Sequence, residues 1–224
     1  MSSPKFLSDD SAIPIEKVDH EQSQVVYPDI YKSHLKSLLI PYSEISKRAS
    51  ELALEIHKAF PCDKPIVLLC ILKGSSPFCH LLMKHLSLLR HPFIIEFLKA
   101  KSYVGTSSSG TVQVSSEKLP STISGRNVLV VEDIVDTGNT LNVLLPILQS
   151  AKPKSVQVCT MLVKRISGST TAQLDSIIPK LFAGFSIPDA FVIGFGLDYN
   201  QLYRDLLDVW IISQEGIAYG ADSK

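Results

Sequence analysis

The sequence has 224 residues, of which 45% are hydrophobic, so the chain is long enough to bury the core of one large domain. Lys and Arg number 22, as do Asp and Glu, and this even balance argues against a protein that holds nucleic acid through bulk positive charge. No apolar run approaches the roughly 18 residues that suggest a membrane span, and the first residues lack the basic and then apolar order of a secretory signal. We therefore expect a cytoplasmic protein that binds neither nucleic acid nor membrane.

The first third of the chain changes from a polar arm to strongly periodic segments. Residues 1–40 are polar, contain three prolines and show no clear period, so we expect a loosely structured arm. A helix is predicted from Ser43, as its N-cap, to about Phe60, because apolar residues recur on one face. Residues 65–72 are apolar throughout, which favours a strand buried on both faces, and Pro77 opens a second helical pattern.

Strands and helices alternate through the rest of the chain. Strands are predicted at 93–103, 128–131, 155–163 and 190–195, and a helix follows the second of these. This order indicates an α/β fold with a mostly parallel sheet flanked by helices.

A segment between two of these strands has an unusual composition. Residues 104–116 carry no charge, and nine of the thirteen are Gly, Ser or Thr, so they cannot order themselves by burying apolar surface. The segment is either a passive linker or a lid over a site.

Cysteine and histidine give no motif. The four cysteines have no C-x-x-C spacing, and the six histidines include no H-E-x-x-H. We expect the cysteines to be buried free thiols in a reducing compartment and assign neither residue type any chemistry. The cysteines are Cys62, Cys70, Cys79 and Cys159.

The most informative stretch is LVVEDIVDTGNTL at 129–141, where a hydrophobic strand runs into Glu132 and Asp133. In open α/β sheets, ligands bind at the carboxyl ends of the strands. These two carboxylates would repel a phosphate placed beside them. They are better suited to accepting hydrogen bonds from sugar hydroxyls or to holding a divalent cation through water.

The turn that follows the two carboxylates has the features of a phosphate site. Gly138 lets the backbone approach a ligand, and Thr137 and Thr140 supply hydroxyls. The free N–H groups at the start of the next helix can surround a phosphate. Carboxylates for a sugar beside amides for a phosphate predict a sugar-phosphate site. The alternative is an acidic strand end followed by an ordinary turn.

Weaker motifs use some of the same letters. Asp-Thr-Gly at 136–138 is also the signature of aspartic proteases, but those enzymes are all-β and here the triplet opens an amphipathic helix. Gly194-x-Gly196 lacks the third glycine and the following helix of a dinucleotide fingerprint, and no P-loop sequence occurs.

The stretch at 129–141 resembles the phosphoribosyl pyrophosphate (PRPP) binding signature of type I phosphoribosyltransferases. Over about residues 25–220, the chain is similar to the hypoxanthine-guanine phosphoribosyltransferases of purine salvage. Further motifs follow in that family's order, at 72–74, 101–103, 162–165, 187–192 and 196–205.

The resemblance implies the type I phosphoribosyltransferase fold in a single domain over 1–224. A small hood would be built from the arm 1–40 and from residues 184–224, and 104–120 would form a flexible active-site lid. The implied reaction transfers ribose 5-phosphate from PRPP to hypoxanthine or guanine, giving IMP or GMP and pyrophosphate. The implied cofactor is Mg²⁺, and the implied assembly is a homodimer or homotetramer.

The resemblance also implies a role for each matching residue. The 5′-phosphate and ribose site would comprise Glu132, Asp133, Asp136, Thr137, Gly138, Asn139 and Thr140. Asp136 would also handle the N7 proton of the purine as the catalytic acid or base. Pyrophosphate would bind at Lys73, Gly74 and Arg204. The base would bind at Lys164, Phe191, Val192 and Asp198. The lid would include Ser102 and Tyr103, and Mg²⁺ would contact Glu132, Asp133 and Asp198.

Simpler interpretations exist for several of these residues when they are taken alone. Lys164 could be an ordinary surface lysine, and Phe191 and Val192 could be core. Relatives commonly carry Lys or Arg where Asn139 stands and a basic residue where Gly168 stands, so we expect weaker PRPP binding than in a fully equipped relative. The alternatives are a weakly active paralogue and a PRPP-sensing regulator on the same fold.

Overall fold

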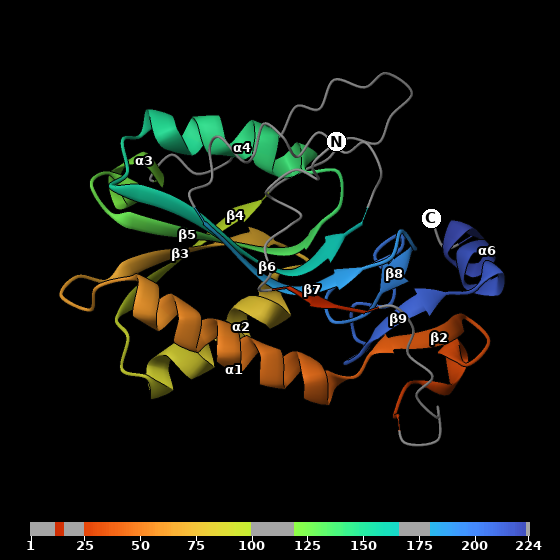
Figure 1. Cartoon of the computed structure of the whole chain (residues 1–224). Helices are drawn as coiled ribbons and strands as arrows, with labels where there is room; N and C mark the ends of the chain where they lie inside the picture. Colours follow the sequence, from red (N-terminus) through yellow and green to blue (C-terminus); the bar gives the residue numbers. More distant parts are fainter. Residues whose placement is uncertain (1–11, 16–24, 100–118, 166–179, 223–224) are drawn as a thin grey trace, which may run out of the picture.

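The computed structural model describes residues 12–15, 25–99, 119–165 and 180–222 (Figure 1). Within these residues, the central sheet is built from β1 (Ile13–Pro14), β3 (Ile66–Leu72), β4 (Phe93–Lys99), β5 (Asn127–Val135), β6 (Ser155–Lys164) and β7 (Leu181–Ile187). The strand order is β1-β7-β6-β5-β3-β4, and every pair is parallel.

Helices cover both faces of this sheet. The helices are α1 (Tyr42–Ala59), α2 (Ser76–Leu88), α3 (Leu119–Ile123) and α4 (Asn139–Ser150). Figure 1 shows α1 and α2 on one face and α4 on the other. A strand in such a sheet must bury both of its faces, which explains why β3 is apolar throughout. Leu68 and Cys70 pack in the core under α1 and α2, whereas Val67 and Leu69 pack in the core under α4.

A second, smaller sheet joins segments far apart in the sequence. It consists of β2 (Leu35–Ile40), β9 (Val209–Ile212) and β8 (Val192–Ile193) in the order β2-β9-β8, with antiparallel pairing. The short 3-10 helix η3 (Asp29–Tyr31) and the helix α6 (Gln214–Asp222) accompany it. A mostly parallel sheet flanked by helices, with a small hood built from N- and C-terminal segments, confirms the expected fold class.

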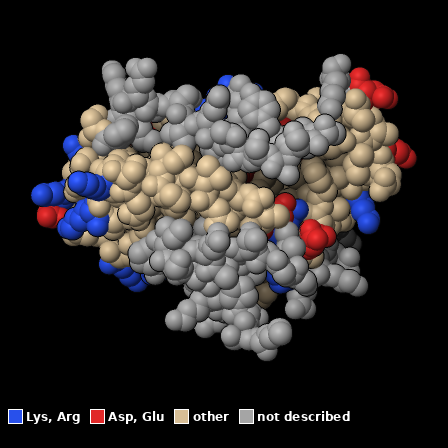
Figure 2. Space-filling view, turned by 90° about the horizontal axis from the view of Figure 1, so that it is seen from above, with Lys and Arg blue, Asp and Glu red and all other residues tan. Residues whose placement is uncertain are grey.

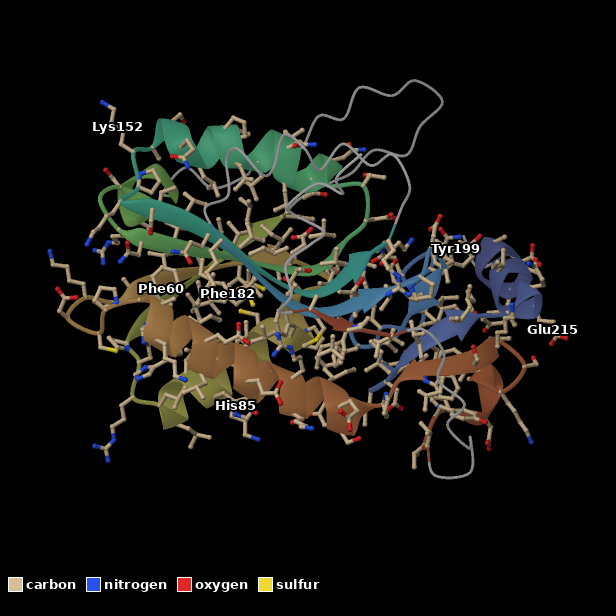
Figure 3. All side chains as sticks on the ribbon, in the orientation of Figure 1. Phe60, His85, Lys152, Phe182, Tyr199 and Glu215 are labelled. Atoms are coloured by element: carbon tan, nitrogen blue, oxygen red, sulfur yellow. The ribbon has the colours of Figure 1, made fainter. Side chains whose placement is uncertain are left out.

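The charges are unevenly distributed along the molecule. Seen from above, Lys and Arg side chains gather at one end and acidic side chains lie mainly toward the other (Figure 2). The basic end is where the parallel strands begin, because Lys152, just before β6, lies at this end in Figure 3. A cavity of about 320 Å³ at these strand starts is lined in part by Lys64, Arg126 and Lys154.

Several expectations about single elements were wrong. The first helix begins at Tyr42 after Pro41, so Ser43 lies inside the first turn and is not the N-cap. The strand expected at 190–195 is reduced to Val192–Ile193 and belongs to the small antiparallel sheet. Its expected place in the parallel sheet is taken by β7, whose run LFAGFSI was overlooked because Gly and Ser interrupt it.

The arm at 1–40 is more ordered than expected over part of its length. Ile13–Pro14 pairs with β7, and Leu35–Ile40 pairs with β9, so these two pieces are strands. The lid expected at 104–120, with Ser102 and Tyr103, falls outside the described residues except for its last two positions, which lie in α3. None of the helices in the described ranges is long and apolar enough to cross a membrane.

Candidate active site

The predicted site residues meet where the parallel strands end. Figure 1 shows β5 and β6 running toward the small sheet, and β5 leads through a turn into α4. β5 extends as far as Val135, so Glu132 and Asp133 belong to the strand itself. Gly138 then adopts a left-handed φ of 80° and caps α4, a conformation that suits glycine.

Two adjoining cavities lie at this edge of the sheet. One, of about 230 Å³, is lined by the continuous stretch 132–141. The other, of about 220 Å³, lies against the small sheet and is lined by Asp133, Ile134, Asp136, Lys164, Phe191, Val192, Leu197 and Asp198. Asp133, Ile134 and Asp136 line both cavities. A single ligand can therefore reach from the helix start to the small sheet, with Asp136 between its two ends.

Three backbone segments approach each other closely beside these cavities. A Cβ added to Gly74 would overlap the carboxylate of Asp133, and a Cβ added to Gly196 would overlap the carbonyl oxygen of Gly74. Gly196 also has a φ of 91°. The loop after β3, the end of β5 and the turn after β8 thus fit together only with glycine at these two positions. The peptide bond between Leu72 and Lys73 is cis.

The adjacent carboxylates are poorly solvated. Glu132 is buried and its Oε2 has no hydrogen-bond partner within the described residues. Burial, with the charge of Asp133, raises the pKa of Glu132 well above its usual range. Burial also raises the pKa of Asp133 to about 6, although its carboxylate accepts the N–H of Ile134 at 2.9 Å. Hydrogen-bond donors or a cation would favour the charged forms of both groups, so the pair is suited to sugar hydroxyls or to a metal ion.

A lysine and an aspartate form an ion pair in the lining of the second cavity. Lys164 Nζ lies 3.1 Å from Asp136 Oδ2 and 3.9 Å from Asp189 Oδ1. The Lys164 side chain is 11% exposed and that of Asp136 is 48% exposed. The O6 and N7 atoms of a 6-oxopurine lie on the same edge of the ring. A cation and a carboxylate this close together match that edge.

The remaining residues of the second cavity come from the small sheet and the turn after it. Phe191 is half-exposed and its ring meets Tyr199 edge to face at 5.4 Å, whereas Val192 is buried. Asp198 Oδ1 pairs with Arg204 Nη2 at 2.6 Å, and Arg204 Nη1 donates to the Gly196 carbonyl. The buried Nε of Arg204 has no partner within the described part of the chain.

The loop after β3 is tied to the same turn. Lys73 Nζ donates to Gln201 Oε1 at 2.9 Å, and the backbone N–H of Gln201 donates to Asp198 at 2.8 Å. Three of the residues predicted for pyrophosphate and Mg²⁺ (Lys73, Arg204 and Asp198) are thus connected in one network. Sequence reasoning missed Gln201 and Asp189, although both lie inside the motifs at 196–205 and 187–192.

The three carboxylates predicted for Mg²⁺ do not form one compact group. Among the described residues, the His, Cys, Asp and Glu side chains with three ligand atoms within 4.8 Å of one another are His57, Cys62 and His91, far along the sheet from this site. Mg²⁺ is usually held by one or two carboxylates and completed by water and substrate phosphates. Asp133 and Asp198 line the same cavity and offer the oxygen ligands that this arrangement needs.

Comparisons with known proteins agree with this geometry. Residues 41–200 match the model of the phosphoribosyl transferase domain. The chain is 39% identical over 197 residues to hypoxanthine-guanine phosphoribosyltransferase of Mus musculus, covering 85% of this chain and 87% of that protein. It is 36% identical over 218 residues to the protein of the same name from Rattus norvegicus, covering 95% and 97%.

A solved structure shows the same fold. A glutamic acid mutant from an analysis of an invariant aspartic acid in HPRTs superposes with a TM-score of 0.69 at 34% sequence identity, covering 81% of this chain and 97% of that one. The domain match, these relatives and the cavities at the strand ends lead to one conclusion: the chain belongs to the phosphoribosyl transferase family.

Proposed function

We propose that this protein transfers ribose 5-phosphate from PRPP to hypoxanthine or guanine, forming IMP or GMP and pyrophosphate. The observation that carries the proposal is the position of Asp136, which lines both cavities and lies 3.1 Å from Lys164. The relatives named hypoxanthine-guanine phosphoribosyltransferase support it, because the chain covers most of their length.

The first cavity suits the sugar phosphate. The backbone N–H groups at the start of α4 and the turn at 136–140 would hold the 5′-phosphate, because a helix start carries free donors and a positive dipole end. Glu132 and Asp133 would accept hydrogen bonds from the ribose hydroxyls. Positive charge builds on the sugar as its bond to pyrophosphate weakens, and two nearby carboxylates favour that charge.

The second cavity suits a 6-oxopurine. Lys164 would donate to O6, and adenine, which has an amino group there, would leave this donor without an acceptor. A ring nitrogen attacks the anomeric carbon, the bond from that carbon to pyrophosphate breaks, and the base loses its N7 proton to Asp136. Phe191 would stack on the base and the Val192 backbone would contact its edge.

The leaving pyrophosphate would be bound by the loop after β3. Lys73, the backbone at Gly74 and Arg204 would contact it. Mg²⁺ bound at Asp133 and Asp198 would neutralise part of its negative charge. Ser102 and Tyr103 remain predicted lid residues.

We further propose that the protein acts in the cytoplasm, a reducing compartment that suits its four free cysteines. We also propose that it assembles as a homodimer or homotetramer, which size-exclusion chromatography would measure.

The assay that tests this function combines the purified chain with PRPP, Mg²⁺ and hypoxanthine, guanine, xanthine or adenine in turn. Product from hypoxanthine or guanine, and none from adenine, is expected. Asp136→Asn should lower turnover about 100-fold or more, because general acid–base catalysis contributes about 10²–10⁴-fold. It should leave the Kd for PRPP within a few-fold of the original.

The matched control is Asp205→Asn, which makes the same change at an exposed carboxylate outside both cavities. Its turnover should be unchanged. Equal losses of turnover and PRPP affinity in Asp136→Asn would contradict the acid–base role.

A weakly active paralogue is favoured by one observation. Asn139 is exposed at the first position of α4 and brings no charge to the phosphate cavity that it lines. Gly168, the other departure from the family pattern, lies outside the described residues. A KM for PRPP far above that of a related hypoxanthine-guanine phosphoribosyltransferase assayed in parallel would support the weakly active paralogue, and a similar KM would exclude it.

A further inference from the structure

A second group of reactive side chains lies at the edge of the sheet opposite the active site. His57 is in the last turn of α1, Cys62 is in the loop before β3, and His91 is in the loop before β4. β3 and β4 begin at this edge, whereas the active site lies where the parallel strands end. Figure 3 labels Phe60, which follows α1 three residues after His57 and packs near Phe182, so its label shows this end of the helix.

The three ligand atoms are close together and arranged as a triangle. Nδ1 of His57 lies 3.2 Å from Nδ1 of His91, and Sγ of Cys62 lies 3.7 Å from the former and 3.3 Å from the latter. His91 is 2% exposed, and its Nε2 has no partner within the described residues, so the polar contacts of this buried ring run through Nδ1. The end of α1 and the loop just after it thus place one nitrogen and one sulfur atom within 3.7 Å of a nitrogen of His91, which lies about 30 residues further along the chain.

This triangle has the dimensions of a tetrahedral zinc site. Zinc bonds of about 2.05 Å to nitrogen and about 2.3 Å to sulfur, at the tetrahedral angle, separate two nitrogens by about 3.3 Å and a nitrogen from the sulfur by about 3.6 Å. The observed nitrogen–nitrogen distance of 3.2 Å agrees, as do the nitrogen–sulfur distances of 3.3 and 3.7 Å.

We propose that His57, Cys62 and His91 form a binding site for Zn²⁺ or a chemically similar first-row divalent metal. Two imidazoles and a thiolate are ligands for zinc, cobalt and copper and not for Mg²⁺, which prefers oxygen. The site is therefore chemically distinct from any Mg²⁺ site among the carboxylates at the strand ends.

The surroundings leave the metal accessible. Cys62 is exposed, while His57 is half-buried and His91 is buried. A metal ion would therefore enter from the Cys62 side, and water would supply the fourth ligand there. With three protein ligands, the bound ion would join the end of α1 to the loops before β3 and β4. We expect it to stabilise the folded state without taking part in the reaction.

Cobalt substitution gives the most direct test. The full-length protein is freed of metal with a chelator, desalted under reducing conditions and titrated with Co²⁺. We expect one equivalent to produce intense tetrahedral ligand-field absorption together with a thiolate-to-cobalt charge-transfer band. Carboxylates at the active site cannot produce the charge-transfer band, and the other three cysteines are buried, so the band is expected from Cys62. Zn²⁺ should then displace Co²⁺ and remove both signals.

The variant Cys62→Ser should abolish the charge-transfer band and weaken Zn²⁺ binding by at least about 100-fold, because even residues that only orient metal ligands contribute about 10–100-fold. Cys62 is exposed in a loop, so the variant should keep its circular dichroism spectrum and its transferase activity. The matched control is His80→Asn, which removes an exposed histidine on α2 away from the group and should leave the titration unchanged.

Thiol reactivity tests the same proposal on the unaltered chain. Cys62 is the exposed one of the four cysteines, so a thiol reagent should modify one cysteine quickly in the native protein, and one equivalent of Zn²⁺ should slow that reaction at least tenfold. Fast modification that Zn²⁺ does not slow, or a Co²⁺ spectrum without a thiolate band, would show that the three groups are a hydrogen-bonded cluster and would overturn the proposal.

Discussion

Gly74 leaves no room for a side chain next to Asp133 in the candidate active site. A Cβ there would occupy the space of the Asp133 carboxylate, so Gly74→Ala must displace either the loop after β3 or the carboxylate. A displacement of about 1 Å in a catalytic site can cost about 100-fold in rate. We therefore expect kcat/KM for PRPP to fall by about that factor, as measured by steady-state kinetics.

The control for Gly74→Ala is Gly125→Ala. Gly125 has a left-handed φ of 65°, but a Cβ added there would meet no atom within 4 Å. This variant should lose some stability through backbone strain and keep its kcat/KM. A comparable loss of kcat/KM in both variants would mean that the close approach to Asp133 is not what matters.

Lys164 provides a test of base recognition. Lys164→Gln removes the charged donor that we propose for O6 of the base, and hydrogen bonds to charged groups contribute about 1.5–3 kcal/mol. We expect kcat/KM for hypoxanthine and guanine to fall about 10- to 100-fold, while the Kd for PRPP changes little. Arg165→Gln is the neighbouring control, because Arg165 donates instead to Ser186 and to the carbonyl of Ile15. If the affinity for PRPP fell by as large a factor as kcat/KM for the bases, Lys164 would not be a base-specific contact.

At the scale of elements, one arginine connects α1 with the sheet. Arg48 is buried and donates from Nη2 to the carbonyl of Ala183 at 2.8 Å and from Nε to that of Gly184 at 3.2 Å, both in β7. Its Nη1 pairs with Glu51 and Glu55 on the same helix at 3.1 Å. The guanidinium thus connects α1 to β7 through two backbone carbonyls.

Arg48→Met should destabilise the protein by about 2–3 kcal/mol, because it fills similar volume but leaves buried acceptors unpaired. Lys47→Met makes the same kind of change at an exposed position one residue away and should change stability by less than about 0.5 kcal/mol. Chemical denaturation of both variants measures the difference. Equal stability of the two would show that the contacts to β7 contribute nothing.

The sequence predicted the long, regular elements best. The helix expected at 43–60 and the strand expected at 155–163 differ from α1 and β6 by at most one residue at each end, because α1 has a clear helical period and the run SVQVCTMLV is rich in apolar and β-branched residues. β7 was missed because Gly184 and Ser186 break its apolar run. β8 was placed in the wrong sheet because strand pairing between 192–193 and 210–211 is a tertiary property that no local pattern carries.

The site was predictable to the extent that its residues are adjacent in the chain. The stretch 132–141 lines one cavity by itself. Lys73 and Gln201 are far apart in the sequence, and His91 is far from His57 and Cys62, so spacing in the sequence reveals neither the network nor the complete triangle. The interpretation that Cys62 is a buried thiol was wrong, whereas Cys70, Cys79 and Cys159 are buried as expected.

At the scale of the whole molecule, the two sheets share a core. One hydrophobic cluster contains Ile40, Val192 and Val209 of the small sheet together with side chains of α1, α2 and the parallel strands. The single tryptophan, Trp210, is 1% exposed in β9, so its fluorescence reports on the small sheet. Continuous packing between the sheets favours one cooperative unfolding transition.

We therefore expect tryptophan fluorescence and far-UV circular dichroism to give the same midpoint on thermal or chemical unfolding. Tyr203→Phe should move both midpoints down together. Its buried hydroxyl donates to the Gly216 carbonyl at 3.0 Å, a bond worth about 1 kcal/mol, which corresponds to about 2–4 °C in a chain of this size. Loss of fluorescence well before loss of ellipticity would show instead that the small sheet unfolds independently.

The pairing of β2 with β9 has a consequence for how the protein is made. Leu35–Ile40 emerges early from the ribosome, but its neighbour Val209–Ile212 is synthesised some 170 residues later, after every strand of the parallel sheet. Translation can thus finish the stretch 132–141 that lines the first cavity long before the small sheet beside the second cavity can form. A nascent chain arrested before residue 209 would expose an unpaired strand edge, which is a natural recognition feature for chaperones.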